Sequence, residues 1–330
     1  MSSQVLMWVG FNVFVLAMLI LDLKVFHRKA HVVSVKESLL WTGFWIALSL
    51  LFNLGIYFWR GDDVALQFLT AYLIEKSLSV DNLFVFLMIF SYFAVPSALQ
   101  HRVLFWGILG AIVMRLAFIL AGIALIEAFS PVMYLFGAFL MLTAVRMARQ
   151  KERKVDPERN PILRLVRRFL PVSDSYEGDK FFVRRAGRRI ATPLFIVVLV
   201  VETTDVMFAT DSIPAVLGIT LDPFIVYSSN VCAILGLRAL YFALAGIIGM
   251  FRYLNQGLVM VLFFIGVKMV IAEFYEMPVG IALGVVASVL LGSILLSVIV
   301  RARQSAVAAS VDPIGAETGP LVEEETTTEQ

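Results

Sequence analysis

The sequence has few of the residues on which redox and thiolate–metal chemistry depend. It contains one cysteine, Cys232, and three histidines among 330 residues. A single cysteine excludes a disulfide or dithiol pair within the chain. His27, His31 and His101 all fall in predicted loops, so no two of them can hold a haem inside a membrane. The sequence also lacks a nucleotide-binding motif, which argues against ATP-driven chemistry, and nothing in it indicates a nucleic-acid partner.

Charged residues are also scarce, at 16% of the chain, whereas 60% of the residues are hydrophobic. Together with a mean hydropathy of +0.89, this composition excludes an ordinary soluble domain. Residues 1–21 carry no charged side chain, so the basic region that begins a cleavable signal peptide is missing. We therefore expect an all-α polytopic membrane protein whose first apolar run is a spanning helix in the lipid bilayer.

Apolar runs of spanning length predict nine transmembrane helices. They lie at about 5–25, 37–58, 64–90, 103–127, 131–148, 191–218, 223–248, 256–275 and 279–300. Lysine and arginine concentrate in every second loop, and Arg60 is the only basic residue of the alternate loops. This alternation predicts a bacterial inner-membrane protein with its N-terminus outside and its C-terminus in the cytoplasm, although an error of one pair of spans stays possible.

Two segments lie outside the predicted spans and have biased composition. Residues 149–190 form a basic cytoplasmic loop with an amphipathic piece at 162–170. This piece suggests a contact with anionic lipid or a regulatory element, or the loop simply carries the positive charge that sets topology. Residues 305–330 are polar and acidic without apolar periodicity, which predicts a disordered tail.

The apolar run 191–218 is unusual because it carries three carboxylates, Glu202, Asp205 and Asp211. One carboxylate at membrane depth costs roughly 2.5–3.5 kcal/mol on insertion scales. Three in one span indicate a polar cavity or a bound cation, unless one or two of them lie at helix ends in water.

The spacing within this run suggests a broken helix. Asp205 and Asp211 are six residues apart, which places them about 120° apart on a regular helix. They converge only if the helix is interrupted, and Pro214 makes that plausible because it excludes the carbonyl of Thr210 from the helical ladder. A freed carbonyl beside carboxylates is typical of a site for a hard cation.

A second acidic cluster lies in the third span. Glu75 and Asp81 are again six residues apart, and Asn82 would then match Ser212. Further sequence matches predict that residues 64–148, with helices 3–5, are repeated as residues 191–275, with helices 6–8. Residues 1–63 then form the first two helices, and residues 276–304 form the ninth. A repeat of three spans reverses its orientation, as in transporters that bind their substrate between two halves at interrupted helices. Chance similarity between apolar sequences is the alternative.

Three cations lie near the middle of spans: Arg115, Arg238 and Lys268. They can reach the interface by snorkelling, or they can pair with the carboxylates. Arg115 and Arg238 occupy matching repeat positions, so each is expected to brace one acidic cluster, whereas Lys268 is a candidate counter-charge that leaves when metal binds. Asn230 is either a neutral oxygen ligand or an interhelical hydrogen-bonding residue.

These segments resemble those of a known family. Residues 75–82 and 201–215 are similar to the two signature motifs of the TerC family of membrane proteins, and 90–96, 233–238 and 264–269 narrow the resemblance to its Alx branch. The similarity runs from about residue 8 to 300. Thr203 departs from the family, which usually has an aliphatic residue there, but this change removes no ligand.

The resemblance implies manganese export across the bacterial inner membrane, with expression that responds to manganese and alkali. Older names for the family are tellurium resistance and membrane-bound redox modulator. The redox name fits this sequence poorly because of its cysteine and histidine content.

We therefore predict a secondary transporter, not an enzyme, that exports Mn²⁺ by exchange with protons. Oxygen ligands suit Mn²⁺, Mg²⁺ and Ca²⁺. The predicted metal ligands are Glu75, Asp81, Glu202, Asp205 and Asp211. The predicted supporting groups are Asn82, Thr210, Ser212 and Asn230. The alternatives are an exporter of another substrate, such as a cationic amino acid, and a non-transporting scaffold or metal sensor. The sequence predicts no oligomeric state.

Overall fold

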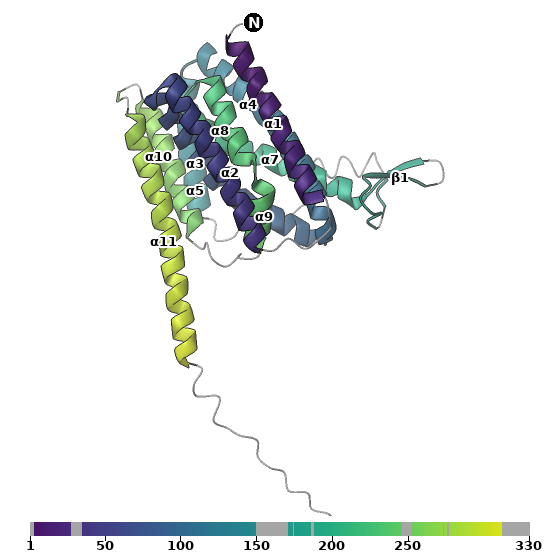
Figure 1. Cartoon of the computed structure of the whole chain (residues 1–330). Helices are drawn as coiled ribbons and strands as arrows, with labels where there is room; N and C mark the ends of the chain where they lie inside the picture. The colour runs from purple at the N-terminus through teal and green to yellow at the C-terminus, as the bar shows by residue number, and fades with distance from the viewer. Residues whose placement is uncertain are drawn as a thin grey trace, which may run out of the picture.

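The computed structural model describes residues 3–27, 35–149, 171–173, 175–185, 188–245, 253–272, 274–275 and 277–311 of the chain. They form long α-helices and one two-stranded sheet (Figure 1). The predicted helical class is therefore confirmed for this part of the chain.

The helices lie where the apolar runs predict them, except that the predicted span 223–248 forms two helices and the last helix continues to Val311, 11 residues beyond its predicted end at 300. The first five are α1 (Ser3–His27), α2 (Val35–Arg60), α3 (Asp62–Tyr92), α4 (Ser97–Ala128) and α5 (Val132–Arg149). The later ones are α7 (Pro193–Leu217), α8 (Pro223–Ile234), α9 (Leu237–Ala245), α10 (Leu254–Ile271) and α11 (Val279–Val311).

Seven helical stretches of the described chain are long and apolar enough to span a bilayer. They are Val35–Arg60, Ser97–Ala128, Val132–Arg149, Pro193–Leu217, Pro223–Ala245, Leu254–Ile271 and Val279–Val300. The other two predicted spans are α1, whose apolar stretch Val5–Leu21 is shorter, and α3, which carries Glu75, Lys76 and Asp81 in its apolar part. The seven spans are thus supported, and the total of nine stays a prediction.

Local chemistry explains where α7 and α8 begin. Pro193 is the first residue of α7 and Pro223 the first of α8. Proline suits this position because the first N–H groups of a helix have no partner inside it. At α8 the carboxylate of Asp222 also accepts from the N–H groups of Phe224 and Ile225, at 3.0 and 3.2 Å, and so caps the helix.

The predicted interruptions near Pro214 and residues 79–81 are wrong. Both α3 and α7 are continuous helices through these positions. Pro214 lies in the last turn of α7, where its missing N–H removes one ladder bond without ending the helix, and residues 79–81 contain neither proline nor glycine. The break lies instead between α8 and α9, where Gly236 has a φ of +82° that favours glycine.

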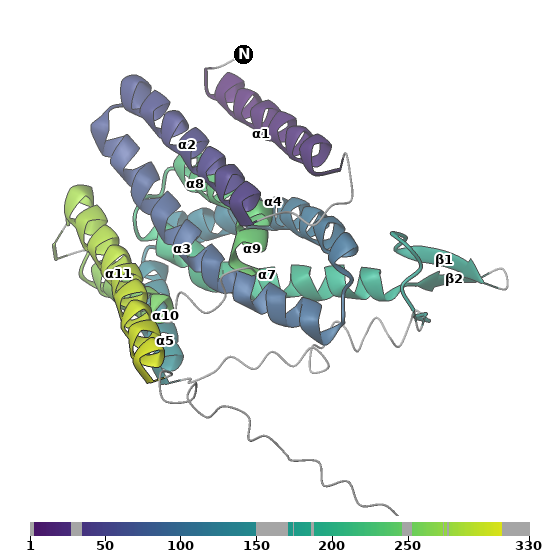
Figure 2. The same cartoon turned by 60° about the horizontal axis from the view of Figure 1, so that its bottom comes forward.

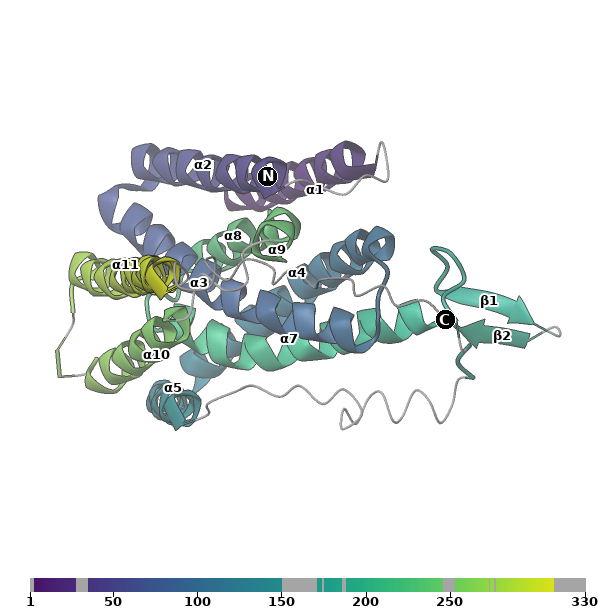
Figure 3. The same ribbon diagram turned by 90° about the horizontal axis from the view of Figure 1, so that it is seen from below.

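The helices pack in pairs from the two predicted repeats. α4 packs along α7, α3 along α8, and α5 along α10. Figures 2 and 3 show α5, α10 and α11 grouped on one side of the bundle. At the α5–α10 crossing a Cβ on Gly137 would lie 2.8 Å from the Gly266 carbonyl oxygen, and one on Gly266 would lie 2.7 Å from the Gly137 carbonyl. This reciprocal contact brings the two backbones as close as small residues allow. The inverted repeat itself stays a prediction.

The predicted loop 149–190 contains a β-hairpin that the sequence did not indicate. β1 (Phe182–Arg185) pairs antiparallel with β2 (Arg188–Ala191). These strands are four residues long and rich in arginine, so they lack the alternating apolar pattern of a typical strand. The amphipathic piece at 162–170 lies outside the described residues.

The predicted tail begins too early at residue 305, because α11 continues as a helix to Val311. The segment 301–311 contains several alanines, arginines and a glutamine, which are good helix formers. The rest of the predicted tail, 312–330, lies outside the described residues.

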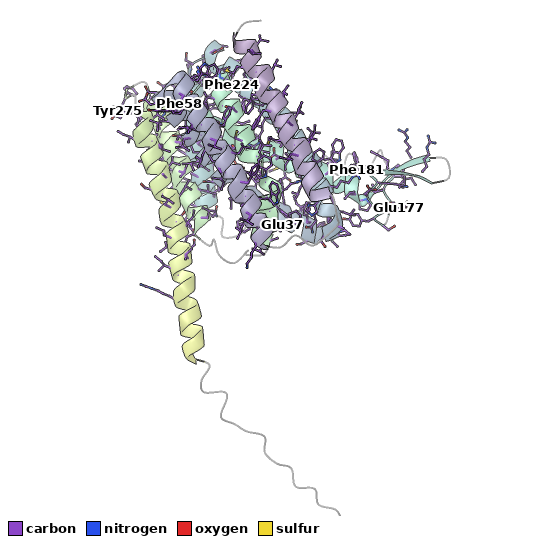
Figure 4. All side chains as sticks on the ribbon, in the orientation of Figure 1. Glu37, Phe58, Glu177, Phe181, Phe224 and Tyr275 are labelled. Carbon is purple, nitrogen blue, oxygen red and sulfur yellow. The ribbon has the colours of Figure 1, made fainter. Side chains whose placement is uncertain are left out.

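The two ends of the bundle agree with the predicted alternation of loops. Figure 4 shows Phe58, Phe224 and Tyr275 at one end and Glu37 and Glu177 toward the other. The first three lie next to loops predicted outside, and the other two next to or within loops predicted to be cytoplasmic. The placement of these ends relative to a membrane stays a prediction.

Candidate functional site

A buried guanidinium lies at the centre of the bundle. Arg115 on α4 is only 2% exposed. It forms ion pairs with Glu75 on α3 and with Asp205 on α7. The Asp205 contact has two branches, from Nε to Oδ2 at 3.4 Å and from Nη2 to Oδ1 at 3.3 Å. This two-branched geometry holds the carboxylate in a fixed orientation relative to α4.

Two neutral side chains complete the contacts of Arg115. Its Nη1 donates to Ser212 Oγ on α7 at 3.3 Å and to Asn230 Oδ1 on α8 at 2.8 Å. The Asn230 amide nitrogen donates to the Val226 carbonyl at 3.3 Å. Asn230 thus makes the interhelical hydrogen bond that was one of its two predicted roles, and its role as an oxygen ligand stays a prediction. Four helices, α3, α4, α7 and α8, contribute to this Arg115 cluster, which we define as Glu75, Arg115, Asp205, Ser212 and Asn230.

The Arg115 cluster contains one more carboxylate than cation. Glu75 and Asp205 carry two negative charges when ionised, and Arg115 supplies one positive charge. Glu75 is 0% exposed, and its oxygen Oε2 has no hydrogen-bond partner among the described residues. An unpaired buried oxygen, above all a charged one, is costly. The cluster can therefore gain stability by taking up a proton or another cation.

The cluster lies midway along its helices. Asp205 is 12 residues from Pro193 and 12 from Leu217, the two ends of α7, or about 18 Å along the axis in each direction. Arg115 and Glu75 also lie in the central parts of α4 and α3. The possibility that Asp205 lies at a helix end in water is thereby excluded.

Glu202 lies one turn before Asp205 on α7 and faces a different part of α4. A Cβ on Gly110 would come within 2.0 Å of Glu202 Oε1 and 2.2 Å of Oε2. The carboxylate therefore occupies the space that a side chain at position 110 would fill. Glu202 is half-buried, so it is more accessible than Glu75 and Asp205.

Asp211 points to another neighbour. Its Oδ1 accepts a hydrogen bond from Thr143 on α5 at 3.4 Å, whereas Asp205 contacts Arg115 on α4. The two aspartates diverge because α7 is unbroken between them. Accordingly, the described side chains include no group of three acidic, histidine or cysteine residues that could hold a metal ion.

The remaining predicted ligands are placed only in part. The side chain of Asp81 lies outside the described residues, although its backbone is helical. Asn82 is buried. Thr210 is exposed, and its hydroxyl donates to the Met207 carbonyl at 2.6 Å. A site that joins all five predicted acids therefore stays a prediction.

Two half-buried lysines contact backbone carbonyls at helix ends. Lys268 on α10 donates from Nζ to the carbonyl of Gly218, which caps the end of α7, at 2.6 Å. Lys76 on α3 donates to the carbonyl of Ala233 in the last turn of α8 at 3.1 Å. Cations stabilise the carbonyl end of a helix. Lys268 thus stabilises the end of α7, which the sequence did not predict. Its role as a counter-charge stays a prediction.

Arg115 contacts Glu75 of the first predicted repeat and also Asp205 of the second, whereas its repeat position predicts contact with one cluster. Arg238 is buried in α9 at 1% exposure, and its contact with the second cluster stays a prediction. Gly110 and Thr143, which contact Glu202 and Asp211, were not predicted as site residues. A lone glycine or threonine in an apolar helix carries no sequence signal of such a contact.

Comparison with known proteins agrees with the sequence resemblance. Residues 60–305 match the family described as "Integral membrane protein TerC family". An uncharacterized membrane protein of Myxococcus xanthus is 50% identical over 293 residues, covering 89% of this chain and 92% of the relative. The Escherichia coli K12 protein named "Putative membrane-bound redox modulator Alx" is 47% identical over 307 residues, covering 90% and 96%. A protein of the same name from Salmonella typhi is 50% identical over 294 residues, covering 86% and 91%. No solved structure matches the chain.

The match covers most of the chain, including every member of the Arg115 cluster, and the Alx relatives align over nearly their full length. On this evidence the chain belongs to the TerC family of integral membrane proteins.

Proposed function

We propose that this protein is a secondary transporter that exports Mn²⁺ from the cytoplasm across the bacterial inner membrane in exchange for protons. The observation that carries the proposal is the excess carboxylate of the Arg115 cluster, buried midway along the spanning helices. The proposal assigns transport and no enzymatic reaction to the chain.

The charge balance of the cluster supports an exchange of cations. With Glu75, Arg115 and Asp205 all charged, the cluster has a net charge of −1 in a buried place. An uncompensated charge in a medium of low dielectric constant is costly. A proton neutralises this charge, and a divalent metal ion overcompensates it by one unit, which a further carboxylate can balance. The proton and the metal ion would therefore compete for the same carboxylates.

The types of oxygen donor support a hard divalent cation. Carboxylate, hydroxyl and amide oxygens come together at Asp205, Ser212 and Asn230. Such ligands suit Mn²⁺, Mg²⁺ and Ca²⁺, whereas softer metals prefer thiolate. We propose that Glu202, Asp211 and Asp81 join these groups in a state in which Arg115 has released one of its carboxylates.

Two other functions are distinguishable from this one. An exporter of a cationic amino acid would use the same carboxylates but would not respond to manganese. A scaffold or metal sensor would need the acids without transport. The name of the Alx relatives suggests redox modulation, but a dithiol couple within one chain is unavailable because Cys232 is its only cysteine, and it is 3% exposed.

The proposal is tested with charge-removing substitutions that keep shape. We expect Glu75→Gln, Asp81→Asn and Asp211→Asn to abolish most of the manganese lowering that the parent produces in manganese-loaded cells. A loss of 1.4 kcal/mol already weakens affinity about tenfold, and removing a ligand charge in a buried site costs more than that. Intracellular manganese is measured at matched membrane abundance.

Asp62→Asn is the matched control, since Asp62 is an exposed acid at the start of α3, and it should leave export unchanged. If well-folded variants of all three acids lower manganese as the parent does, these residues are not ligands and the proposed site is wrong.

A further inference from the structure

The arginine-rich hairpin is fixed in place immediately before a spanning helix. Thr192 is the one residue between β2 and α7. Its N–H donates to the Phe181 carbonyl at 2.9 Å, and its hydroxyl donates to the Lys180 carbonyl at 2.7 Å. Tyr176 donates from its hydroxyl to the Phe93 carbonyl, beyond the end of α3, at 2.8 Å. The hairpin therefore cannot lie far from the end of the bundle.

A second contact fixes the base of the hairpin to α4. Arg102 forms an ion pair with Asp179, and its guanidinium lies 5.0 Å from the ring centroid of Phe181. Figure 4 shows Phe181 and Glu177 beside the hairpin. Asp179 is thus already paired with Arg102.

The strand register places like charges opposite each other. Arg184 pairs with Arg189, and Arg185 pairs with Arg188. Like charges directly opposite on neighbouring strands are destabilising. Arg184 and Arg189 are both exposed, so water and salt reduce this repulsion but do not remove it. An anion that contacts both arginines at once would convert the repulsion into an attraction.

An exposed aromatic ring lies on the same face as these two arginines. Alternate residues of a strand point to the same side, so Phe182 shares a face with Arg184, and Arg189 lies opposite Arg184 on that face. Phe182 is 45% exposed. Its ring centroid lies 4.7 Å from that of Phe195, in the first turn of α7. We call Phe182, Arg184 and Arg189 the arginine face.

We propose that the arginine face binds the headgroups of anionic phospholipids in the membrane that contains α7. Its charge complements phosphate groups, and an aromatic ring beside arginines is typical of membrane-surface contacts. Figures 2 and 3 show the hairpin just beyond the first turn of α7, roughly in line with this helix. Because α7 is long and apolar enough to span a bilayer, its first turn should lie at the bilayer surface, next to the arginine face.

The same features favour lipid over nucleic acid as the partner. A nucleic acid would be read from the aqueous side and does not need a position one residue before a spanning helix. Phe182 contacts Phe195, so the arginine face is joined to the first turn of an apolar helix of spanning length. Each arginine near an anionic surface should tighten the contact about fivefold.

The experiment uses the purified full-length protein in nanodiscs made of phosphatidylcholine alone or mixed with phosphatidylglycerol. Trypsin cleavage after Arg185 and Arg188 is followed by mass spectrometry. We expect slower cleavage in the anionic nanodiscs, and we expect added salt to remove the difference because it screens charge. The variant Arg184→Gln/Arg189→Gln retains both cleavage sites and should weaken the protection about 30-fold.

The control variant Lys36→Gln/Arg303→Gln loses the same number of charges at exposed positions on α2 and α11, and it should keep the protection of the parent. Equal cleavage of the parent in both kinds of nanodisc overturns the proposal. Protection by a short RNA in neutral nanodiscs, without protection by anionic lipid, also overturns it and identifies a nucleic-acid partner instead.

Discussion

Replacement of Arg115 by glutamine tests the charge balance of the cluster. Arg115→Gln leaves Glu75 and Asp205 buried without the guanidinium that contacts both. Breaking a buried ion pair by removing one partner typically costs about 3–5 kcal/mol. The loss of the hydrogen bonds to Ser212 and Asn230 raises this cost further. A hydrogen bond typically contributes about 0.5–1.5 kcal/mol, but the contributions of neighbouring contacts do not simply sum. We therefore expect a loss of stability of at least about 3 kcal/mol.

The assay heats the purified protein in detergent and measures the fraction that remains monodisperse at each temperature. Arg60→Gln is the matched control, because Arg60 forms a partly exposed ion pair with Asp222 at 2.7 Å, and such pairs contribute about 0–1 kcal/mol. The double variant Glu75→Gln/Arg115→Gln removes one of the two uncompensated acids and should recover part of the loss. If Arg115→Gln unfolds no earlier than Arg60→Gln, the two carboxylates do not depend on Arg115 and the charge balance proposed here is wrong.

Three further predictions concern the neighbours of the site, the helix break and topology. Gly110→Ala should displace the Glu202 carboxylate, which lies 2.0 Å from the new Cβ, and so reduce manganese export at normal membrane abundance. The control is Gly107→Ala, whose Cβ meets only a Val201 methyl at 2.9 Å; equal export by the two variants would show that Glu202 is not part of the site. Gly236→Ala should cost about 1–3 kcal/mol through its positive φ and its contact with Trp45 at 2.5 Å, whereas Gly55→Ala meets nothing within 4 Å and should be nearly neutral in the same unfolding assay. Cysteines at Gly178 and Gly315 should react with membrane-impermeant reagents only after the cells are opened, over a low background from buried Cys232; labelling in intact cells would contradict the predicted orientation.

The positions of the helices could be predicted because each one buries a long apolar run. Hydrophobic length sets where α4, α7 and α10 lie, and Pro193 and Pro223 mark where two helices begin. The break at Gly236 could not be predicted in the same way. A glycine in an apolar run reads equally well as a packing residue, and only the positive φ and the Trp45 contact distinguish it.

The site could be predicted by residue type but not by partner. Burial of Glu75, Asp205 and Arg115 follows from charges placed in apolar runs. The contact of Arg115 with acids from both predicted repeats depends on how α3, α4 and α7 pack, which no local spacing encodes. Asp205 and Asp211 do not converge as expected, because a proline in the last turn of a helix does not end the helix.

Cation exchange at the buried carboxylates can be measured as metal flux in reconstituted proteoliposomes with an imposed pH gradient. We expect the parent protein to accumulate Mn²⁺ against its gradient on the side from which protons leave, and we expect an inverted gradient to reverse the flux. Glu75→Gln, which removes the excess charge while leaving the Arg115–Asp205 pair, should abolish this coupling in correctly folded protein. Mn²⁺ flux that is absent in the parent, or equal in the parent and in Glu75→Gln, would contradict cation exchange at these carboxylates.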